Sequence, residues 1–316
     1  MHVIISHRNP CTLLAMTALV AVVACGKDSD EPFLLSGGGS SPSSPPTLEP
    51  DEKGVAARLE VPALKSGNTF VYHTTTEGGR KVMSYCLEFD PAKMHSRWVA
   101  FRFDGLTRPR SNVGRTEAWS DDPALPLSMH IGTNYFGSPY NRGHLCASYD
   151  RQYSFAANAQ TFYMSNMSPQ VGDFNAYYWT TLEQLVQDCG RSASFADTLY
   201  VVKGGYIDDT SDLKRSTAYP DGYLSRPNGK RMAIPSHYFM ALLRVKGGSY
   251  TSIAFWTTND SHGYSNGNYA PRSVVRQDAI SVRQLEELTG IDFFHNLPDN
   301  IEKSVEATFD FNTWNI

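Results

Sequence analysis

The segment from residue 140 to residue 183 constrains the chain most, because its polar side chains recur at spacings typical of two backbone conformations. It begins Tyr140-Asn141-Arg142-Gly143-His144. In an extended segment, residues i and i+2 share a face, so Arg142 and His144 can point into one cleft. Gly143 between them leaves room for a backbone or a substrate to approach closely. The segment therefore predicts a cleft lined by a guanidinium and an imidazole.

Helical spacing relates the polar residues at the other end of this segment. Residues 173–187 have helical periodicity, with Asp173 as a candidate N-cap. On a helix, Asn175, Trp179 and Glu183 form one i, i+4, i+8 stripe. The Asn175 carboxamide offers a neutral oxygen to a hard cation, and Mg²⁺ suits a site with few protein ligands because it often keeps several waters. Glu183 would face the same cleft.

These residue types fit the hydrolysis of a phosphodiester bond, which needs an activated water, positive charge at the phosphate and help for the leaving oxygen. His144 exchanges a proton near neutral pH, because the unperturbed pKa of His is about 6.5. Each residue taken alone also has a structural interpretation: a His packed in the core, an Asn that caps a helix, a Glu on a solvated helix face. Their combination in one segment favours a catalytic site.

The same residues resemble two motif blocks of the DNA/RNA non-specific endonucleases, the ββα-metal nucleases. Asn141-Arg142-Gly143-His144 is similar to the Asp-Arg-Gly-His motif of that family, and the resemblance extends over about residues 58–310. The second block and the further matches are Ser165-Asn166-Met167-Ser168-Pro169-Gln170, Asp173-Phe174-Asn175, Trp179, Leu182-Glu183 and the segments 200–205, 234–239 and 284–294.

The resemblance implies a role for each matching residue. His144 is the general base that activates water. Asn175 is the direct ligand of Mg²⁺, with Mn²⁺ or another divalent cation as the alternative, and Glu183 holds a metal-bound water. Arg142 contributes positive charge at the phosphate, and Asn166 helps to shape the site.

The chain departs from the family pattern at two positions. Asn141 replaces the Asp of the motif, which keeps the shape of the side chain but removes its charge. The family also carries an Arg upstream of this motif, at a position that holds Glu117 here. We expect Arg115 to take the role of that arginine, with Arg110 as the second candidate.

The hydrophobic pattern predicts an α+β fold with a central antiparallel sheet flanked by helices, and the resemblance adds a ββα-metal motif at the site. Apolar and polar residues alternate in residues 69–74 and 82–89, around the turn-forming Gly78-Gly79, and residues 98–103 give the third strand of a meander. Further strands are predicted at residues 160–166, 198–207, 233–243 and 250–256, and a second helix at residues 281–289, ending at Gly290.

The N-terminal region predicts export and a lipid anchor. Residues 1–25 match a lipoprotein signal peptide: the apolar run 13–24 is shorter than the about 20 residues that span a bilayer, and the small residues before Cys25 resemble a bacterial lipobox. A plain secretory signal is the alternative. Residues 26–57, rich in Ser, Gly and Pro, predict a flexible linker, and residues 58–316 the endonuclease domain. The lipid would hold the protein at a bacterial membrane, facing the periplasm or the cell surface.

Composition sets further limits. The formal net charge of −4 argues against a generally basic nucleic-acid coat, but it allows a local basic groove. Three of the five Cys residues, Cys86, Cys146 and Cys189, lie in the predicted domain. Two of them could form a disulfide in an exported protein, and the sequence leaves the pair open. The sequence holds no Cys/His cluster at zinc spacing, which argues against a structural zinc.

Three hypotheses of different classes follow. The first is a Mg²⁺-dependent endonuclease that binds DNA and RNA through phosphates, and therefore without sequence preference. The second, prompted by Asn141 and Glu117, is a catalytically weakened lipoprotein that binds nucleic acid at the cell surface. The third is a surface lipoprotein that binds carbohydrate or protein through its aromatic side chains, although such residues more often lie in the core. The paired motif blocks favour the endonuclease.

Overall fold

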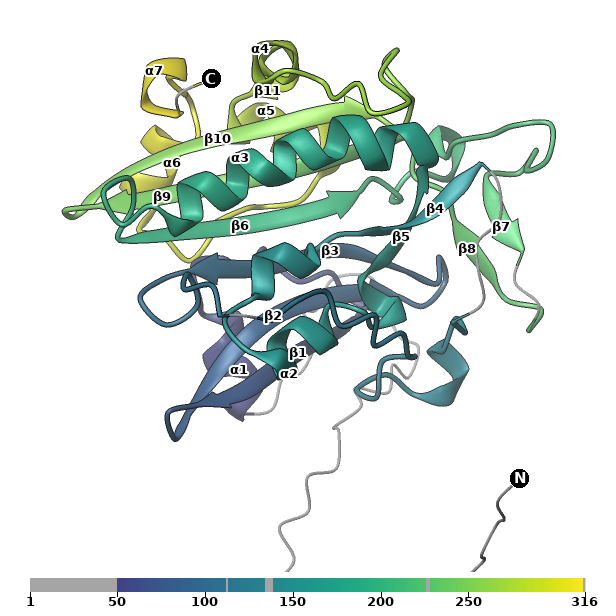
Figure 1. The fold of residues 1–316 in the computed structure, drawn as a ribbon, viewed down its shortest axis with the longest axis horizontal. Coiled ribbons are helices and arrows are strands. Elements are labelled where there is room, and N and C mark those ends of the chain that lie inside the picture. The colour runs from purple at the N-terminus through teal and green to yellow at the C-terminus, as the bar shows by residue number, and fades with distance from the viewer. Residues whose placement is uncertain (1–49, 112, 134–138, 226–227, 315) are drawn as a thin grey trace, which may run out of the picture. The chain divides into compact units, whose positions relative to one another are not determined.

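A computed structural model describes residues 50–111, 113–133, 139–225, 228–314 and 316 (Figure 1). Seven strands form one sheet in the order β1-β2-β3-β6-β9-β10-β11, and every neighbouring pair is antiparallel. The predicted α+β class and central antiparallel sheet are confirmed. The strands are β1 (Thr69–Glu77), β2 (Arg80–Asp90), β3 (His95–Phe103), β6 (Thr198–Gly205), β9 (His237–Lys246), β10 (Ser249–Thr258) and β11 (Ala279–Ile280).

Two small antiparallel sheets lie outside the central one. One pairs β4 (Tyr140–His144) with β5 (Met167–Val171), and the other pairs β7 (Tyr223–Ser225) with β8 (Arg231–Ala233). The helices are α1 (Pro50–Ala56), α2 (Phe155–Gln160), α3 (Thr180–Arg191), α4 (Arg272–Val275), α5 (Val282–Thr289), α6 (Asp299–Val305) and α7 (Phe311–Trp314). Short turns of 3₁₀-helix include η2 (Ser148–Arg151) and η3 (Met164–Asn166), and η4 (Phe174–Trp179) is a π-helix that leads into α3.

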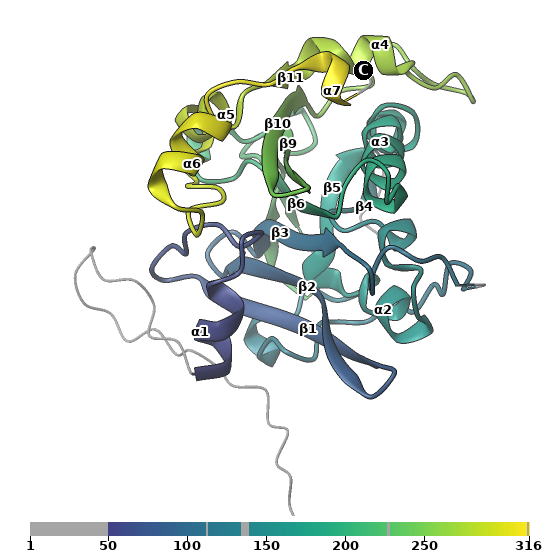
Figure 2. The same ribbon diagram turned by 90° about the vertical axis from the view of Figure 1, so that its left-hand side faces the viewer.

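The central sheet separates two hydrophobic cores. Successive side chains of a strand point to opposite faces, so Val201 packs on one side and Val202 on the other. The first core includes Leu182 and Leu185 of α3, and the second includes Leu285 of α5. Figure 2 shows α3 on one side of the sheet, with β4 and β5, and α5 and α6 on the other. The β4–β5 ribbon and α3 are therefore assembled on the same side of the sheet.

Local sequence signals predicted several elements correctly. The β1–β2–β3 meander is confirmed, and Gly78 and Gly79 in its first turn have positive φ angles of 56° and 77°. The helix predicted at residues 281–289 is α5, which begins after the capping residue Ser281 and ends at Gly290 with φ of 65°. Both turns use glycine because a side chain disfavours the left-handed backbone.

The strand predicted at residues 160–166 is wrong. Helix α2 ends at Gln160, a turn follows, and η3 occupies residues 164–166 before β5 begins at Met167. Phe162 and Met164 are buried in this turn, so a turn can contain apolar residues as a buried strand does. The strand predicted at residues 233–243 is divided, because Pro235 lies between the end of β8 and the start of β9 and cannot donate a ladder hydrogen bond.

The predicted linker lies mainly outside the described residues, as do the signal segment and Cys25. Its last residues form α1, and Val55 and Ala56 pack against the second core, so folded structure begins before residue 58. Among the described residues, no helix combines the length and the apolar character needed to cross a membrane. Cys86, Cys146 and Cys189 are all buried free thiols, so no disulfide joins any two of them.

His95 gives this fold a predictable dependence on pH. Its ring is fully buried, Nδ1 lies 2.7 Å from the Ser96 carbonyl, and burial lowers its pKa to about 4. Unfolding restores a pKa of about 6.5, so the unfolded chain binds more protons between these values and stability falls on acidification. When the pH falls from 7 to 5, His95 becomes protonated in the unfolded chain but not in the folded protein. We expect this difference to lower the free energy of unfolding by about 2 kcal/mol. In urea unfolding, the free energy of unfolding of His95→Gln should therefore change by about 2 kcal/mol less between pH 7 and pH 5 than that of the native protein. An equal change in the two proteins would contradict this.

Candidate active site

The β4–β5 ribbon carries Arg142 and His144. In the antiparallel register, Arg142 lies opposite Pro169 and His144 opposite Met167, so the extended conformation predicted for this segment is confirmed. Gly143 lies between them against the side chain of Gln170. A Cβ atom at position 143 would come within 2.0 Å of Gln170 Oε1, so glycine is required for this close packing.

Strand β5 is braced by polar side chains that the sequence analysis did not identify. The Ser168 hydroxyl lies 2.6 Å from His95 Nε2 and 2.5 Å from the Tyr238 hydroxyl. Asn259 Nδ2 donates to the Pro169 carbonyl at 3.0 Å. His95, Tyr238 and Asn259 come from the central sheet or its edge, so these bonds fix the ribbon on the sheet.

Asn166 is fully buried where the chain leaves β4. Its Nδ2 donates to the carbonyls of Cys146 and Thr161 at 2.9 and 2.7 Å, and its Oδ1 accepts from the Cys146 amide at 2.8 Å. A carboxamide can satisfy donors and acceptors at once, which an apolar or acidic side chain of this size could not do here. Asn166 thus fixes the backbone two residues after His144.

His144 lies in an aromatic enclosure. Its ring centroid is 5.6 Å from that of Trp119 and 5.0 Å from that of Phe162, and only 7% of the residue is exposed. Within the described residues, its buried Nε2 has no hydrogen-bond partner. Burial, and then the charges of Arg115 and Arg142, hold the pKa of His144 well below its usual value. The imidazole is therefore neutral at pH 7.

Two guanidinium groups lie on the same aromatic side chains. Arg142 lies over Trp119, with 3.7 Å between Cζ and the ring centroid, and its Nη1 donates to the Thr133 carbonyl at 3.2 Å. Arg115 lies 4.9 Å from the centroid of Phe162. The structure thus places both predicted arginines beside His144, where they form a cationic wall.

Glu117 holds part of this wall in place. One carboxylate oxygen accepts from Arg115 Nε, and the other accepts from the Trp119 indole at 2.8 Å. Glu117 has a φ of 51°, a left-handed conformation that is uncommon for residues other than glycine. This residue, which stands where the family pattern has an Arg, therefore orients both Arg115 and Trp119.

The predicted helical stripe differs from an ideal α-helix. Residues 174–179 wind as the π-helix η4, and Asp173 makes no side-chain cap bond. Trp179 is fully buried in the first core, whereas Asn175 and Glu183 are half-buried. Asn175 lies near the start of η4, four residues after β5 ends at Val171. π-Helical turns occur frequently at functional sites, and their wider winding changes which residues share a face.

Glu183 shares charged neighbours with His144. Burial raises the pKa of Glu183 to about 7, and the nearby positive charges of Lys203 and Arg115 oppose that shift. The same Lys203 and Arg115 help to lower the pKa of His144. Because such interactions weaken with distance, the carboxyl group of α3 and the imidazole of β4 both lie near Lys203 and Arg115.

A buried ion pair underlies this region. Lys203 Nζ of β6 lies 2.8 Å from Asp150 Oδ2, and both side chains are fully buried. Asp150 also accepts from the Ala147 amide at 3.0 Å and from Gln187 Nε2 of α3 at 3.1 Å. The pair therefore joins the central sheet, η2 and α3. Its sequence signal was a lysine inside the otherwise apolar strand 198–205.

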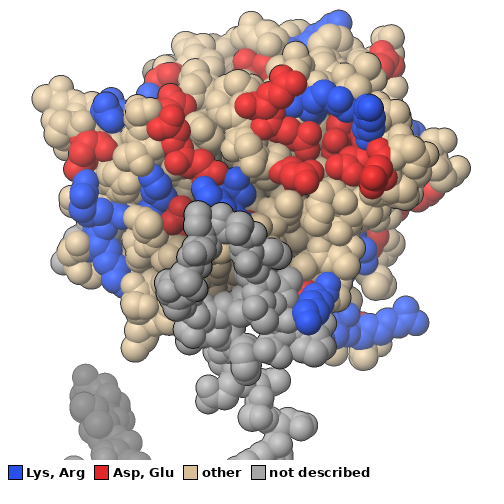
Figure 3. Space-filling view, turned by 180° about the vertical axis from the view of Figure 1, so that it is seen from behind, with Lys and Arg blue, Asp and Glu red and all other residues tan. Residues whose placement is uncertain are grey.

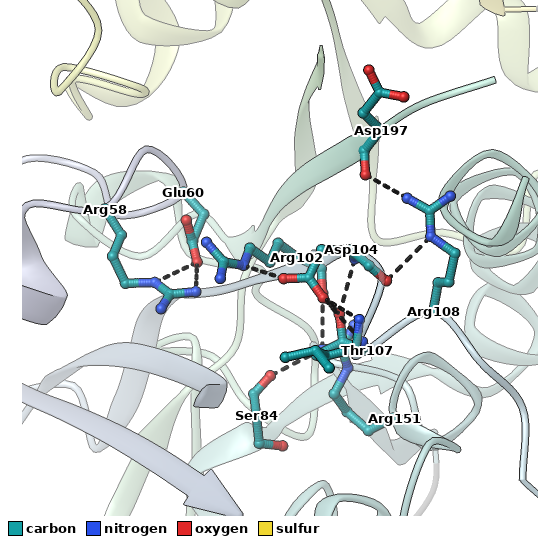
Figure 4. Close-up of polar contacts among 10 residues, drawn as sticks. Arg58, Glu60, Ser84, Arg102, Asp104, Thr107, Arg108, Arg151 and Asp197 are labelled. Atoms are coloured by element: carbon teal, nitrogen blue, oxygen red, sulfur yellow. Dashed lines mark hydrogen bonds and ion pairs between the residues drawn. The ribbon is translucent and has the colours of Figure 1, made fainter. Parts of the chain in front are cut away.

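Arg151 anchors the adjacent residue of η2. Its Nη1 donates to the carbonyls of Ser84 and Arg102, each at 3.1 Å (Figure 4), and its guanidinium lies 4.5 Å from the centroid of Phe101. The residue is fully buried. Carbonyl and aromatic contacts thus stabilise a guanidinium next to Asp150, which would otherwise be costly to bury.

Two side chains of the helical segment that follows β5 suit a hard divalent cation with few protein ligands. Asn175 supplies a carboxamide oxygen and Glu183 a carboxylate on the helical segment beside the ribbon. Within the described part of the chain, no three His, Cys, Asp or Glu side chains are grouped to hold a metal. Mg²⁺ fits such a donor set, because it dehydrates reluctantly and binds through one or two side chains.

Comparisons with known proteins identify similar sequences and a similar fold. A family model described as DNA/RNA non-specific endonuclease matches residues 65–300. A nuclease of Nostoc sp. is 30% identical over 230 residues, which span 72% of this chain and 76% of the relative. The mitochondrial nuclease EXOG of Xenopus laevis is 28% identical over 284 residues, or 84% of this chain and 72% of the relative. A solved chain from the EndoG/EndoGI complex is 20% identical to this chain and has a TM-score of 0.57. The match covers 81% of this chain and 96% of the solved chain, which shows that the two share a fold.

Proposed function

Because the chain belongs to the DNA/RNA non-specific endonuclease family, and so is a hydrolytic endonuclease, we propose that it cuts DNA and RNA with Mg²⁺ and with His144 as general base. One observation carries the proposal: a buried, neutral imidazole lies beside two guanidinium groups and shares the charged neighbours Lys203 and Arg115 with Glu183. Neutral imidazole accepts a proton, whereas imidazolium does not, so the environment of His144 suits a base at pH 7.

His144 Nε2 is the atom that supports the role of base. It has no hydrogen-bond partner among the described residues, so no protein group competes for its lone pair. The enclosure by Trp119 and Phe162 leaves the ring few other orientations. His144 would take one proton from that water as the water attacks phosphorus, and the proton would later return to solvent.

Arg142 and Arg115 would bind the phosphate that is attacked. Guanidinium groups donate charge-assisted hydrogen bonds to phosphate oxygens and stabilise the charge that develops there. Contacts of this kind carry no sequence information, which supports cleavage without base preference. Arg115 must exchange its ion pair with Glu117 for the phosphate, and such exposed pairs are worth only about 0–1 kcal/mol.

Asn175 and Glu183 would hold the divalent cation, with Mn²⁺ or a related ion as a substitute. When bound, this cation supplies Lewis-acid stabilisation to the phosphate and the leaving oxygen. Asn166, Ser168 and the Lys203–Asp150 pair keep the two sides of the cleft in register, through the hydrogen bonds described above. Asn141, on β4 beside Arg142, would help to shape the same cleft without contributing charge.

We further propose that the protein acts outside the cytoplasm, as a lipoprotein acylated at Cys25. The support is the apolar run 13–24, the small residues before Cys25 and the Ser/Gly/Pro-rich stretch that follows. Such a tether would leave the catalytic domain free to reach nucleic acid at the membrane surface.

The proposed activity is tested by incubating the purified protein with plasmid DNA and with RNA. We expect Mg²⁺ to support degradation of both and EDTA to abolish it. Salt-sensitive binding without any turnover would instead favour the weakened nucleic-acid-binding lipoprotein. In that case, Asn141→Asp should restore cleavage by returning the acidic residue of the motif.

A further inference from the structure

The loop that follows β3 brings Arg110 alongside η2. The Ser111 amide and hydroxyl both donate to the Gln152 carbonyl, at 2.9 and 2.6 Å, and Gln152 Nε2 donates to the Val113 carbonyl at 3.0 Å. Figure 4 shows the start of this loop, where Arg108 bonds to the carbonyls of Asp104 and Asp197. The loop is therefore fixed at both sides of Arg110, which is exposed.

Arg191, the last residue of α3, reaches the same short element. Its Nη2 donates to the Tyr149 carbonyl, three residues before the Gln152 carbonyl that holds Ser111. Its Nε is buried and has no hydrogen-bond partner within the described residues. Arg110 and Arg191, called here the arginine pair, thus approach η2 from the loop and from the helix.

The carboxylates near the arginine pair are already engaged. Asp150 is paired with Lys203, and Asp188 is paired with Arg272. Burial lowers the pKa of Arg191, Asp150 and Asp188 raise it, and the positive charges of Arg110 and Arg151 lower it further. Because each of these Asp residues is already paired with another cation, the three guanidinium groups keep a net positive charge. A cluster with net positive charge attracts an anion.

The C-terminal elements carry acidic side chains. Figure 3 shows a cluster of Asp and Glu on one part of the face it presents, with Lys and Arg elsewhere on that face. In the C-terminal elements, burial and the charges of Glu286, Glu302 and Asp292 raise the pKa of Glu306 to about 9. Helix α3, which carries Arg191, lies on the other side of the sheet from α5 and α6 (Figure 2). A nucleic-acid strand would therefore be repelled by the acidic side chains of the C-terminal elements.

The spacing along α3 relates the arginine pair to the active site. Glu183 and Arg191 are eight residues apart on α3, and a helix rises 1.5 Å per residue, so the separation is about 12 Å. A strand of duplex DNA advances about 3.4 Å per nucleotide, so this length corresponds to about three to four nucleotides. Tyr149, which is 47% exposed, lies next to the arginine pair and offers a ring on which a base can stack.

We propose that Arg110 and Arg191 bind a second backbone phosphate of a DNA or RNA strand, about three to four nucleotides from the phosphate that is attacked. The inference rests on the proposed function, because it extends the path of the same substrate. A second phosphate site makes the enzyme prefer strands that are long enough to occupy both sites, which is the behaviour of an endonuclease. A dinucleotide would reach only the active site.

The experiment measures the affinity of the full-length protein for a fluorescent single-stranded 20-mer in EDTA, so that binding is separated from cleavage. For Arg110→Gln combined with Arg191→Gln, we expect Kd for the 20-mer to rise about tenfold and the slope of log Kd against log salt to fall by about one. Competition by a dinucleotide should change much less. Arg110→Gln alone keeps the Arg191–Tyr149 bond and should shift Kd in the same direction.

The matched control is Arg80→Gln combined with Lys81→Gln, which removes two exposed cations at the start of β2 and should leave Kd unchanged. An unchanged Kd in both arginine variants would overturn the second phosphate site. An equal loss of 20-mer and dinucleotide binding would also overturn it, because a general disturbance of the cleft would explain that result. Cleavage with Mg²⁺ is measured in parallel, and wild-type binding without cleavage would count against the proposed function alone.

Discussion

His144→Ala is expected to lower the rate of plasmid cleavage by about 10²–10⁴-fold, the usual contribution of a general base. The substitution removes an imidazole that is unprotonated at pH 7, that has an unpartnered Nε2 and that is held between Trp119 and Phe162. Binding of DNA in EDTA should change little, because Arg115 and Arg142 remain. The rate is measured under single-turnover conditions at saturating Mg²⁺.

A matched control is His295→Ala. His295 is half-buried, and burial also lowers its pKa, but it follows Phe293 and Phe294 in the core on the other face of the sheet. This variant should retain its cleavage rate per folded molecule. Full activity in His144→Ala would remove His144 from the reaction, whatever the effect of the control.

Lys203→Met is expected to reduce the free energy of unfolding by about 3–5 kcal/mol, the usual cost of leaving one partner of a buried ion pair without the other. Lys203 and Asp150 are both fully buried, so the remaining Asp150 carboxylate would lose its cation in a place that water does not reach. Its bonds from the Ala147 amide and Gln187 would compensate only in part. Urea unfolding at pH 7 gives the measurement.

The double variant Lys203→Met with Asp150→Asn separates a buried charge from a lost contact. Removing both charges should return part of the lost stability, because the cost arises mainly from the unpaired carboxylate. If the loss of stability in the double variant equals the sum of the losses in Lys203→Met and Asp150→Asn, the two residues are not coupled. That outcome would contradict the role given to the pair.

Elements with local signals could be predicted from the sequence. The β1–β3 meander follows from period-two alternation around Gly78-Gly79, and α5 follows from Ser281 and Gly290 at its two ends. The placement of Arg142 and His144 on one extended segment required only their spacing. These predictions succeeded because each depends on residues that are close in sequence.

Features that depend on distant partners could not be predicted in this way. Phe162 packs against Trp119 and His144, so an apolar residue that suggested a strand is buried in a turn. The π-helical winding of residues 174–179 has no periodicity that distinguishes it from an α-helix in so short a run. Lys203 and Asp150 are 53 residues apart, and only the assembled sheet brings them together.

Glu117 shows how a departure from a family pattern acquires a physical interpretation. From the sequence, it was an acidic residue in place of an arginine. In the structure, its carboxylate joins Arg115 to Trp119 beside His144, so the positive charge is supplied from two positions earlier and held by the substituted residue. The cationic wall is thus present although the residue at position 117 has the opposite charge.

The central claim is that Asn175 holds a divalent cation in the cleft that His144 and Glu183 face. The most direct measurement is the anomalous scattering of crystals grown with Mn²⁺ in place of Mg²⁺. We predict a peak within coordinating distance of Asn175 Oδ1. A peak bound elsewhere in the molecule, with none at Asn175 under conditions that support cleavage, would contradict the account.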